Sequence, residues 1–114
     1  MSLTADEQDA HDMSRLAKGQ EAALNDLMER HAQRLFQYLL RSLQNESDAA
    51  DLAQETFVRV YQNRARFDAH HKFSTWLYAI LLHRYQKSHA KLPEYFFTHN
   101  MRAAENIDKI ESEL

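Results

Sequence analysis

Apolar residues recur along most of this chain at the three- and four-residue spacing of amphipathic helices. The pattern predicts four helices, over residues 12–18, 21–44, 47–62 and 74–91. The second has apolar residues over so wide an arc that it should contact two neighbours, which makes it the centre of a bundle. The predicted fold class is therefore all-α, a small bundle of about four helices.

Residues with strong capping preferences stand at the ends of these helices. Gly19 is placed to end the first helix as a C-terminal cap, and Ser47 is a good N-cap for the third. Ser74 or Thr75 can cap the fourth, and Pro93 stops it or marks its end. The predicted boundaries therefore have a chemical basis as well as a periodic one.

The length of 114 residues is enough for one small domain with a single core. We expect residues 1–11 to form an N-terminal tail and residues 12–91 to form the domain. Residues 92–114 are expected to form a linker or a short C-terminal helix, because their apolar residues stand at roughly helical spacing.

The composition narrows the possible functions. The absence of Cys fits a reducing compartment. The sequence shows no signal-peptide pattern and no apolar run near the ~20 residues of a membrane span. We therefore expect a cytoplasmic protein without membrane contact. His70 and His71 point apart, and His83 and His89 lack the spacing that puts two metal ligands on one helical face. Since no nucleophile motif or Gly-rich phosphate loop occurs either, we expect a binding module, not an enzyme, with no metal and no cofactor.

Charge changes sign along the chain. Residues 1–57 carry five Lys or Arg against eleven Asp or Glu, whereas residues 58–91 carry seven against one. Such a basic segment can attract phosphates even though the net charge is −3, because electrostatic steering depends on the local field. The alternative is an ordinary solvated basic helix.

The third predicted helix has a clear division between its faces. Its apolar stripe consists of Ala49, Leu52, Ala53, Thr56, Phe57 and Val60. Asp48, Asp51 and Glu55 are therefore turned outward, with Gln54 and Arg59 beside them. This acidic surface is either a docking site for a basic partner or an ordinary solvated face.

The segment between the third and fourth helices combines basic and aromatic residues. Such a loop, feeding a basic helix, is a plausible site for single-stranded nucleic acid, since stacking on an aromatic side chain contributes about 1–3 kcal/mol per base. The alternative is that Phe67, Phe73 and Trp76 fill the junction between the helices.

These segments resemble a known family. The stretches DLAQETFVRVYQNRARFD (51–68) and KFSTWLYAI (72–80) are similar to region two of bacterial sigma factors of the extracytoplasmic-function branch, and RLAKGQEAALNDLMERH (15–31) is similar to the opening helices of that domain. The resemblance implies a sigma region two bundle that acts in transcription initiation. Sigma factors of this branch also have a second, helix-turn-helix region four domain, so we expect the chain to be a fragment that lacks it.

The resemblance implies two partners. The acidic helix would dock on the coiled coil of the largest catalytic subunit of core RNA polymerase, using Asp48, Asp51, Gln54, Glu55 and Arg59. The loop and fourth helix would recognise and melt the promoter minus-ten element, holding its single-stranded non-template strand. The DNA-binding candidates are Arg64, Arg66, Phe67, Asp68, His70, His71, Lys72, Phe73, Ser74, Trp76, His83, Arg84 and Lys87. An anti-sigma protein is expected to cover the same surfaces.

The fourth helix departs from the family's pattern. Ala79, Leu82 and His83 stand where relatives commonly have arginines and an asparagine. Either the promoter preference differs, or DNA contact is weaker and another partner covers Leu81, Leu82 and Tyr85. The alternative functions are therefore a degenerate sigma-like protein interaction module with little DNA binding, and an unrelated helical bundle.

Overall fold

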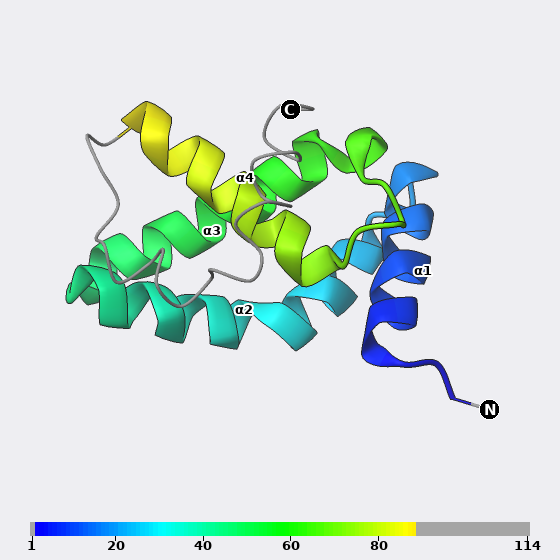
Figure 1. Cartoon of the computed structure of the whole chain (residues 1–114), viewed down its shortest axis with the longest axis horizontal. Helices are drawn as coiled ribbons and strands as arrows, with labels where there is room; N and C mark the ends of the chain where they lie inside the picture. The colour runs from blue at the N-terminus through cyan, green and yellow to red at the C-terminus, as the bar shows by residue number, and fades with distance from the viewer. Residues whose placement is uncertain (1, 89–114) are drawn as a thin grey trace.

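The computed structural model describes residues 2–88, with side chains described through residue 83. They form the helices α1 (Ala5–Ala17), α2 (Ala22–Leu43), α3 (Glu46–Gln62) and α4 (Phe73–Ser88), with a 3-10 turn, η1 (Arg64–Arg66), between α3 and α4. The helix α2 packs against both α1 and α3, while α4 packs against α3 and α1 (Figure 1). The predictions of an all-α bundle and of a central second helix are confirmed.

Within the described residues, one hydrophobic core holds the four helices together. The stripe predicted on α3 is buried apart from Leu52, which is half-buried. On α4, buried residues point in almost every direction around the helix, as expected for a helix that is apolar all round. They are Phe73, Trp76, Leu77, Ala79, Ile80, Leu81 and Leu82. Another partner is therefore not needed to cover Leu81 and Leu82, because both already belong to the core.

The first helix begins at Ala5, so its predicted start at Asp12 is wrong. A capping box fixes the earlier start: the Glu7 N–H donates to Thr4 Oγ1 (3.1 Å) and the Thr4 N–H donates to Glu7 Oε1 (3.2 Å). Most of the expected tail is therefore helical.

Two other helix starts also differ from the prediction. Asn45, not Ser47, caps α3, because its Oδ1 accepts the Asp48 N–H at 3.0 Å. Helix α4 begins at Phe73, before both predicted caps. The expected extension of α4 to Lys91 and the segment 92–114 lie outside the described residues.

Gly19 ends α1, as predicted, with a backbone φ of 94°. The N–H groups of Gly19 and Gln20 donate to the carbonyls of Leu16 and Arg15, both at 3.0 Å, which is the Schellman pattern. A Cβ at Gly19 would meet nothing within 4 Å, so a substitution there costs backbone strain and not a clash.

We expect Gly19→Ala to lower the free energy of unfolding by about 1 kcal/mol, because a side chain disfavours positive φ. Urea denaturation measures this loss. The matched variant Gly19→Asn should lose less, since Asn tolerates the left-handed region better than Ala. Equal losses in the two variants would contradict the role given to backbone strain.

Candidate functional site

The outer surface of α3 carries the residues predicted to bind a basic partner. We call Asp48, Asp51, Gln54, Glu55 and Arg59 the acidic face. Asp48, Asp51 and Gln54 are exposed. Glu55 forms an ion pair with Arg59 one turn later, in which Arg59 Nε donates to Glu55 Oε1 at 3.3 Å. The acidic face therefore presents carboxylates on a rigid helix.

Val58 is an apolar residue on this surface that the sequence analysis missed. It is 43% exposed and lies one turn beyond Gln54 and two turns beyond Asp51. The sequence does indicate this position, because Val58 is apolar but does not belong to the buried stripe of its helix. The acidic face thus borders a small apolar contact area.

The predicted loop, residues 64–72, begins where α3 ends, and we call it the basic loop. The Arg64 guanidinium lies 4.2 Å from the centroid of the Tyr61 ring and donates from Nη1 to the Tyr61 carbonyl (2.9 Å). Arg64 therefore stabilises the C-terminal end of α3. Lys72, by contrast, is exposed and forms no ion pair within the described part of the chain.

A short turn organises the middle of the basic loop. Asp68 Oδ1 accepts the backbone N–H of His70 (2.9 Å) and lies 2.7 Å from His70 Nδ1, while the His71 N–H donates to the Asp68 carbonyl (2.9 Å). The hydrogen bond from the His70 backbone, followed by the one from its side chain, holds the pKa of Asp68 below its usual range. The His70 side chain is 94% exposed, so this turn presents an imidazole to solvent.

Three aromatic residues meet beneath the basic loop. Phe67 packs edge-on against Trp76 and Phe73, with ring centroids 5.3 and 6.2 Å apart. Phe73 and Trp76 are each 1% exposed, whereas Phe67 is half-buried. The position of Phe73 and Trp76 is that of residues filling the helix junction, so within this conformation only Phe67 of the three reaches the surface.

The remaining candidates lie on α4. Ser74 and His83 are half-buried, and the side chains of Arg84 and Lys87 are outside the described residues. Ala79 and Leu82 are 0% and 3% exposed. Their apolar character, which had indicated a weakened DNA surface, therefore has a role in core packing.

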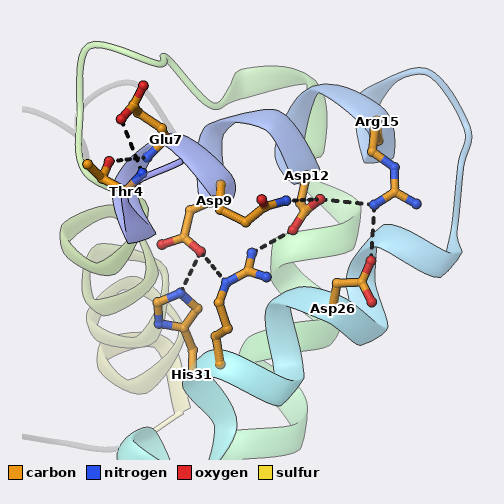
Figure 2. A network of polar contacts seen from close by, with 9 residues as sticks. Thr4, Glu7, Asp9, Asp12, Arg15, Asp26 and His31 are labelled. Carbon is orange, nitrogen blue, oxygen red and sulfur yellow. Dashed lines mark hydrogen bonds and ion pairs between the residues drawn. The ribbon is translucent and has the colours of Figure 1, made fainter. Parts of the chain in front are cut away.

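Two buried carboxylates link α1 to α2 in a polar network that the sequence analysis missed (Figure 2). Asp9 and Asp12 are 1% and 0% exposed. Arg30 donates from Nε to Asp9 Oδ1 (2.9 Å) and from Nη2 to Asp12 Oδ2 (2.6 Å). His31 Nε2 lies 2.9 Å from the same oxygen of Asp9. The network thus crosses between helices that are adjacent in sequence.

Asp12 has further partners within α1. Arg15 Nη1 donates to its Oδ1 (2.9 Å), and Gln8 Nε2 does so at 3.2 Å. Burial raises the pKa of Asp12, but the hydrogen bonds from Arg30, Arg15 and Gln8 outweigh burial and hold the pKa below its usual value. A signal was present in the sequence, because Asp9 and Asp12 share one helical stripe with Met13 and Leu16.

Two other kinds of site, a membrane span and a metal site, have no support among the described residues. Among residues 2–88, none of the helices combines the length and apolar character that a membrane crossing requires. Within the same part of the chain, no three His, Cys, Asp or Glu side chains gather in a way that could hold a metal ion.

Comparison with known proteins connects these surfaces to a family. The Sigma-70 region 2 family matches residues 27–93. The ECF RNA polymerase sigma factor SigW of Bacillus subtilis is 32% identical over 96 residues, which are 83% of this chain and 51% of the relative. RNA polymerase sigma factor YlaC of the same organism is 34% identical over 76 residues, 67% of this chain and 44% of the relative.

RNA polymerase sigma factor CarQ of Myxococcus xanthus is 38% identical over 68 residues, 60% of this chain and 39% of the relative. The chain thus spans about half the length of the first of these relatives and less of the others. The family match covers more than half of the chain and includes the acidic face, the basic loop and the described part of α4. The chain therefore belongs to the Sigma-70 region 2 family and is a region 2 domain of the ECF sigma factor type.

Proposed function

We propose that this domain acts in transcription initiation, binding core RNA polymerase through the acidic face and the promoter minus-ten element through the basic loop. The observation that carries the proposal is that both surfaces lie within the matched residues, one along α3 and the other starting at its C-terminal end. The relatives' names, which call them RNA polymerase sigma factors, support the same conclusion.

The acidic face is suited to a basic protein surface. Exposed carboxylates such as Asp51 accept short, charge-assisted hydrogen bonds from arginine, and Gln54 beside it adds a neutral donor and acceptor. Val58 supplies the apolar contact that such an interface needs to exclude water. The proposed partner is the coiled coil of the largest catalytic subunit of the polymerase.

The basic loop is suited to a melted strand. Extruding a base costs a few kcal/mol of unstacking, which the protein must offset by stacking and by hydrogen bonds to the base edge. Phe67 offers a partly exposed ring, and the turn formed by Asp68 and His70 offers an acceptor and an imidazole beside it. Lys72 can neutralise a phosphate. Phe73 and Trp76 support this surface from below.

Binding of a single-stranded minus-ten oligonucleotide is expected to weaken as salt rises, because each neutralised phosphate releases counterions. The Lys72→Ala variant should bind more weakly and reduce the slope of log K against log salt by about 0.7, the value for one phosphate of a single strand. Fluorescence anisotropy over a salt series measures both effects. Lys18→Ala, at the exposed end of α1, is the matched control and should leave the slope unchanged. Equal affinity across the salt series would rule out a phosphate contact.

Two assays together distinguish this proposal from a sigma-like protein interaction module. A sigma domain binds both core polymerase in a pull-down and the melted strand in solution, whereas an interaction module binds the polymerase or another protein without the strand. An unrelated helical bundle binds neither. An anti-sigma protein that covered either surface would block the corresponding assay, which is how we propose the domain is regulated.

A further inference from the structure

The imidazole of His31 on α2 contacts both α1 and the start of α4. On one side its Nε2 lies 2.9 Å from Oδ1 of the buried Asp9, in the network shown in Figure 2. On the other side its ring packs against Phe73, with centroids 4.9 Å apart and planes tilted by 50°. His31 therefore joins the ionic network of α1 to the aromatic cluster beneath the basic loop.

The contacts continue from Phe73 into the basic loop. Phe73 packs against Phe67 and Trp76, at centroid distances of 6.2 and 6.1 Å. Phe67 is the residue that ends η1 and directly precedes the turn at Asp68. Helix α1 also packs against η1 and α4, and Figure 1 shows it standing beside the loop that enters α4. The basic loop therefore lies against α1 and against the aromatic cluster that His31 contacts.

We propose that His31 is a positioning residue for the basic loop, through which the buried carboxylate of Asp9 sets the placement of Phe73 and Phe67. This inference rests on the proposed function, because it assumes that the basic loop binds the melted strand. It adds a role for α1, which lies outside the residues matched by the family.

The physical basis is the fixed orientation of the imidazole. Asp9 Oδ1 already accepts from Arg30 Nε at 2.9 Å, and a carboxylate so paired offers only acceptor sites. The Nε2–H of His31 therefore donates to it, and this bond fixes the plane of the ring in the way that carboxylates orient histidines elsewhere. A tilted ring contact has a preferred geometry, so a fixed imidazole restricts where the ring of Phe73 can lie.

A comparison of Asp9 with Asp12 distinguishes this positioning role from a general contribution to stability. Asp9 and Asp12 both accept from Arg30, but only Asp9 contacts His31. Loss of either should loosen the attachment of α1 to α2. Only the contact through His31 should alter the aromatic cluster.

Trp76 provides a direct readout, because it is the only tryptophan of the chain and lies buried in this cluster. The variant to test in the full chain is His31→Gln, which keeps a donor near Nε2 and removes the ring. We expect its Trp76 emission to shift without DNA, its affinity for the melted strand to fall about tenfold, and its affinity for core polymerase to stay unchanged. The control Asp12→Asn should be less stable but, at temperatures where it is folded, should match the original chain in emission and strand affinity.

Each outcome decides the inference. Unchanged strand affinity in His31→Gln would overturn it, as would equal falls in strand and polymerase affinity, which indicate a general loss of structure. If the original chain binds no strand, the proposed function fails separately, and Trp76 emission decides whether His31 positions the cluster: a shift supports it and no shift overturns it. Should His31→Gln not fold, His31→Phe keeps a ring against Phe73 and removes the bond to Asp9, so the same measurements apply.

Discussion

A chain carrying both Asp51→Arg and Glu55→Arg is expected to bind core RNA polymerase at least about 100-fold more weakly than the original chain. Like charges brought together at an interface cost several kcal/mol, and each 1.4 kcal/mol is a tenfold loss of affinity. The exposed Asp51 would meet a basic partner with the wrong sign, and Glu55→Arg would also remove the ion pair with Arg59. A pull-down titration with core polymerase measures the loss.

The fold should survive this double substitution. The ion pair between Glu55 and Arg59 is partly exposed, and such a pair contributes only about 0.3–0.5 kcal/mol to a helix. The matched control reverses two exposed acids elsewhere, Asp6→Arg with Glu29→Arg, and should retain polymerase binding. Normal binding by the Asp51 and Glu55 variant, or an equal loss in the control, would show that the acidic face is not the docking surface.

The second large effect concerns stability. Asp12→Asn is expected to lower the free energy of unfolding by about 3 kcal/mol, because removing one partner of a buried ion pair leaves the other charge uncompensated. Asp12 accepts hydrogen bonds from the guanidinium groups of Arg15 and Arg30. The amide of Asn would turn an N–H donor towards one of these two groups. We place the loss at the lower end of the usual range because Arg15 and Arg30 are 29% and 30% exposed. Urea denaturation followed by circular dichroism measures it.

The matched control for this effect is Asp26→Asn. Asp26 binds the same Arg15 at 3.0 Å, but its side chain is 47% exposed. An exposed ion pair contributes at most about 1 kcal/mol, so this variant should be nearly as stable as the original chain. Equal losses in the two variants would contradict the importance given to burial.

The pH dependence of stability follows from the same carboxyl group. The pKa of Asp12 is lower in the folded chain than its usual value of 3.8, so the folded state favours the ionised form. Its contribution is therefore present above pH 3.8 and is lost as the pH falls through the lowered pKa. The difference in stability between the original chain and Asp12→Asn should shrink over that range. A difference that stayed constant would mean that the ionised carboxylate is not the source of the effect.

The sequence predicted the helices whose apolar residues follow a strong period. The stripe on α3 and the extent of α2 needed only the spacing of apolar residues, since burying one face is what stabilises each helix. Gly19 was predictable because few other residues tolerate its backbone conformation. Local rules sufficed at these positions.

The start of α1 could not be predicted from apolar spacing. Aspartate is rarely buried, so the predicted helix starts only at Asp12 and leaves Asp9 in a polar tail. Their burial depends on Arg30, which is 21 and 18 residues away in sequence and reaches them only in the folded chain. The capping box of Thr4 and Glu7 was a local sign of the earlier start.

The candidate site was predictable in outline only. The outward orientation of the acidic face followed from the helical period. Whether Phe73 and Trp76 would stack on a base or fill the core could not be decided, because an aromatic side chain serves either purpose equally well. Their 1% exposure shows that they fill the core.

The enclosure of α4 on nearly all sides over residues 73–83, whose side chains the structure describes, has a consequence for how such a domain can diversify. Substitutions in a packed core commonly cost several kcal/mol, so the buried positions between Phe73 and Leu82 tolerate few replacements. Exposed positions of the basic loop, such as Ala69 and His70, tolerate most replacements within about 0.5 kcal/mol. New nucleotide preferences can therefore arise by exchanging loop residues while the packed helix is retained, and a combinatorial library aimed at altered specificity belongs in that loop.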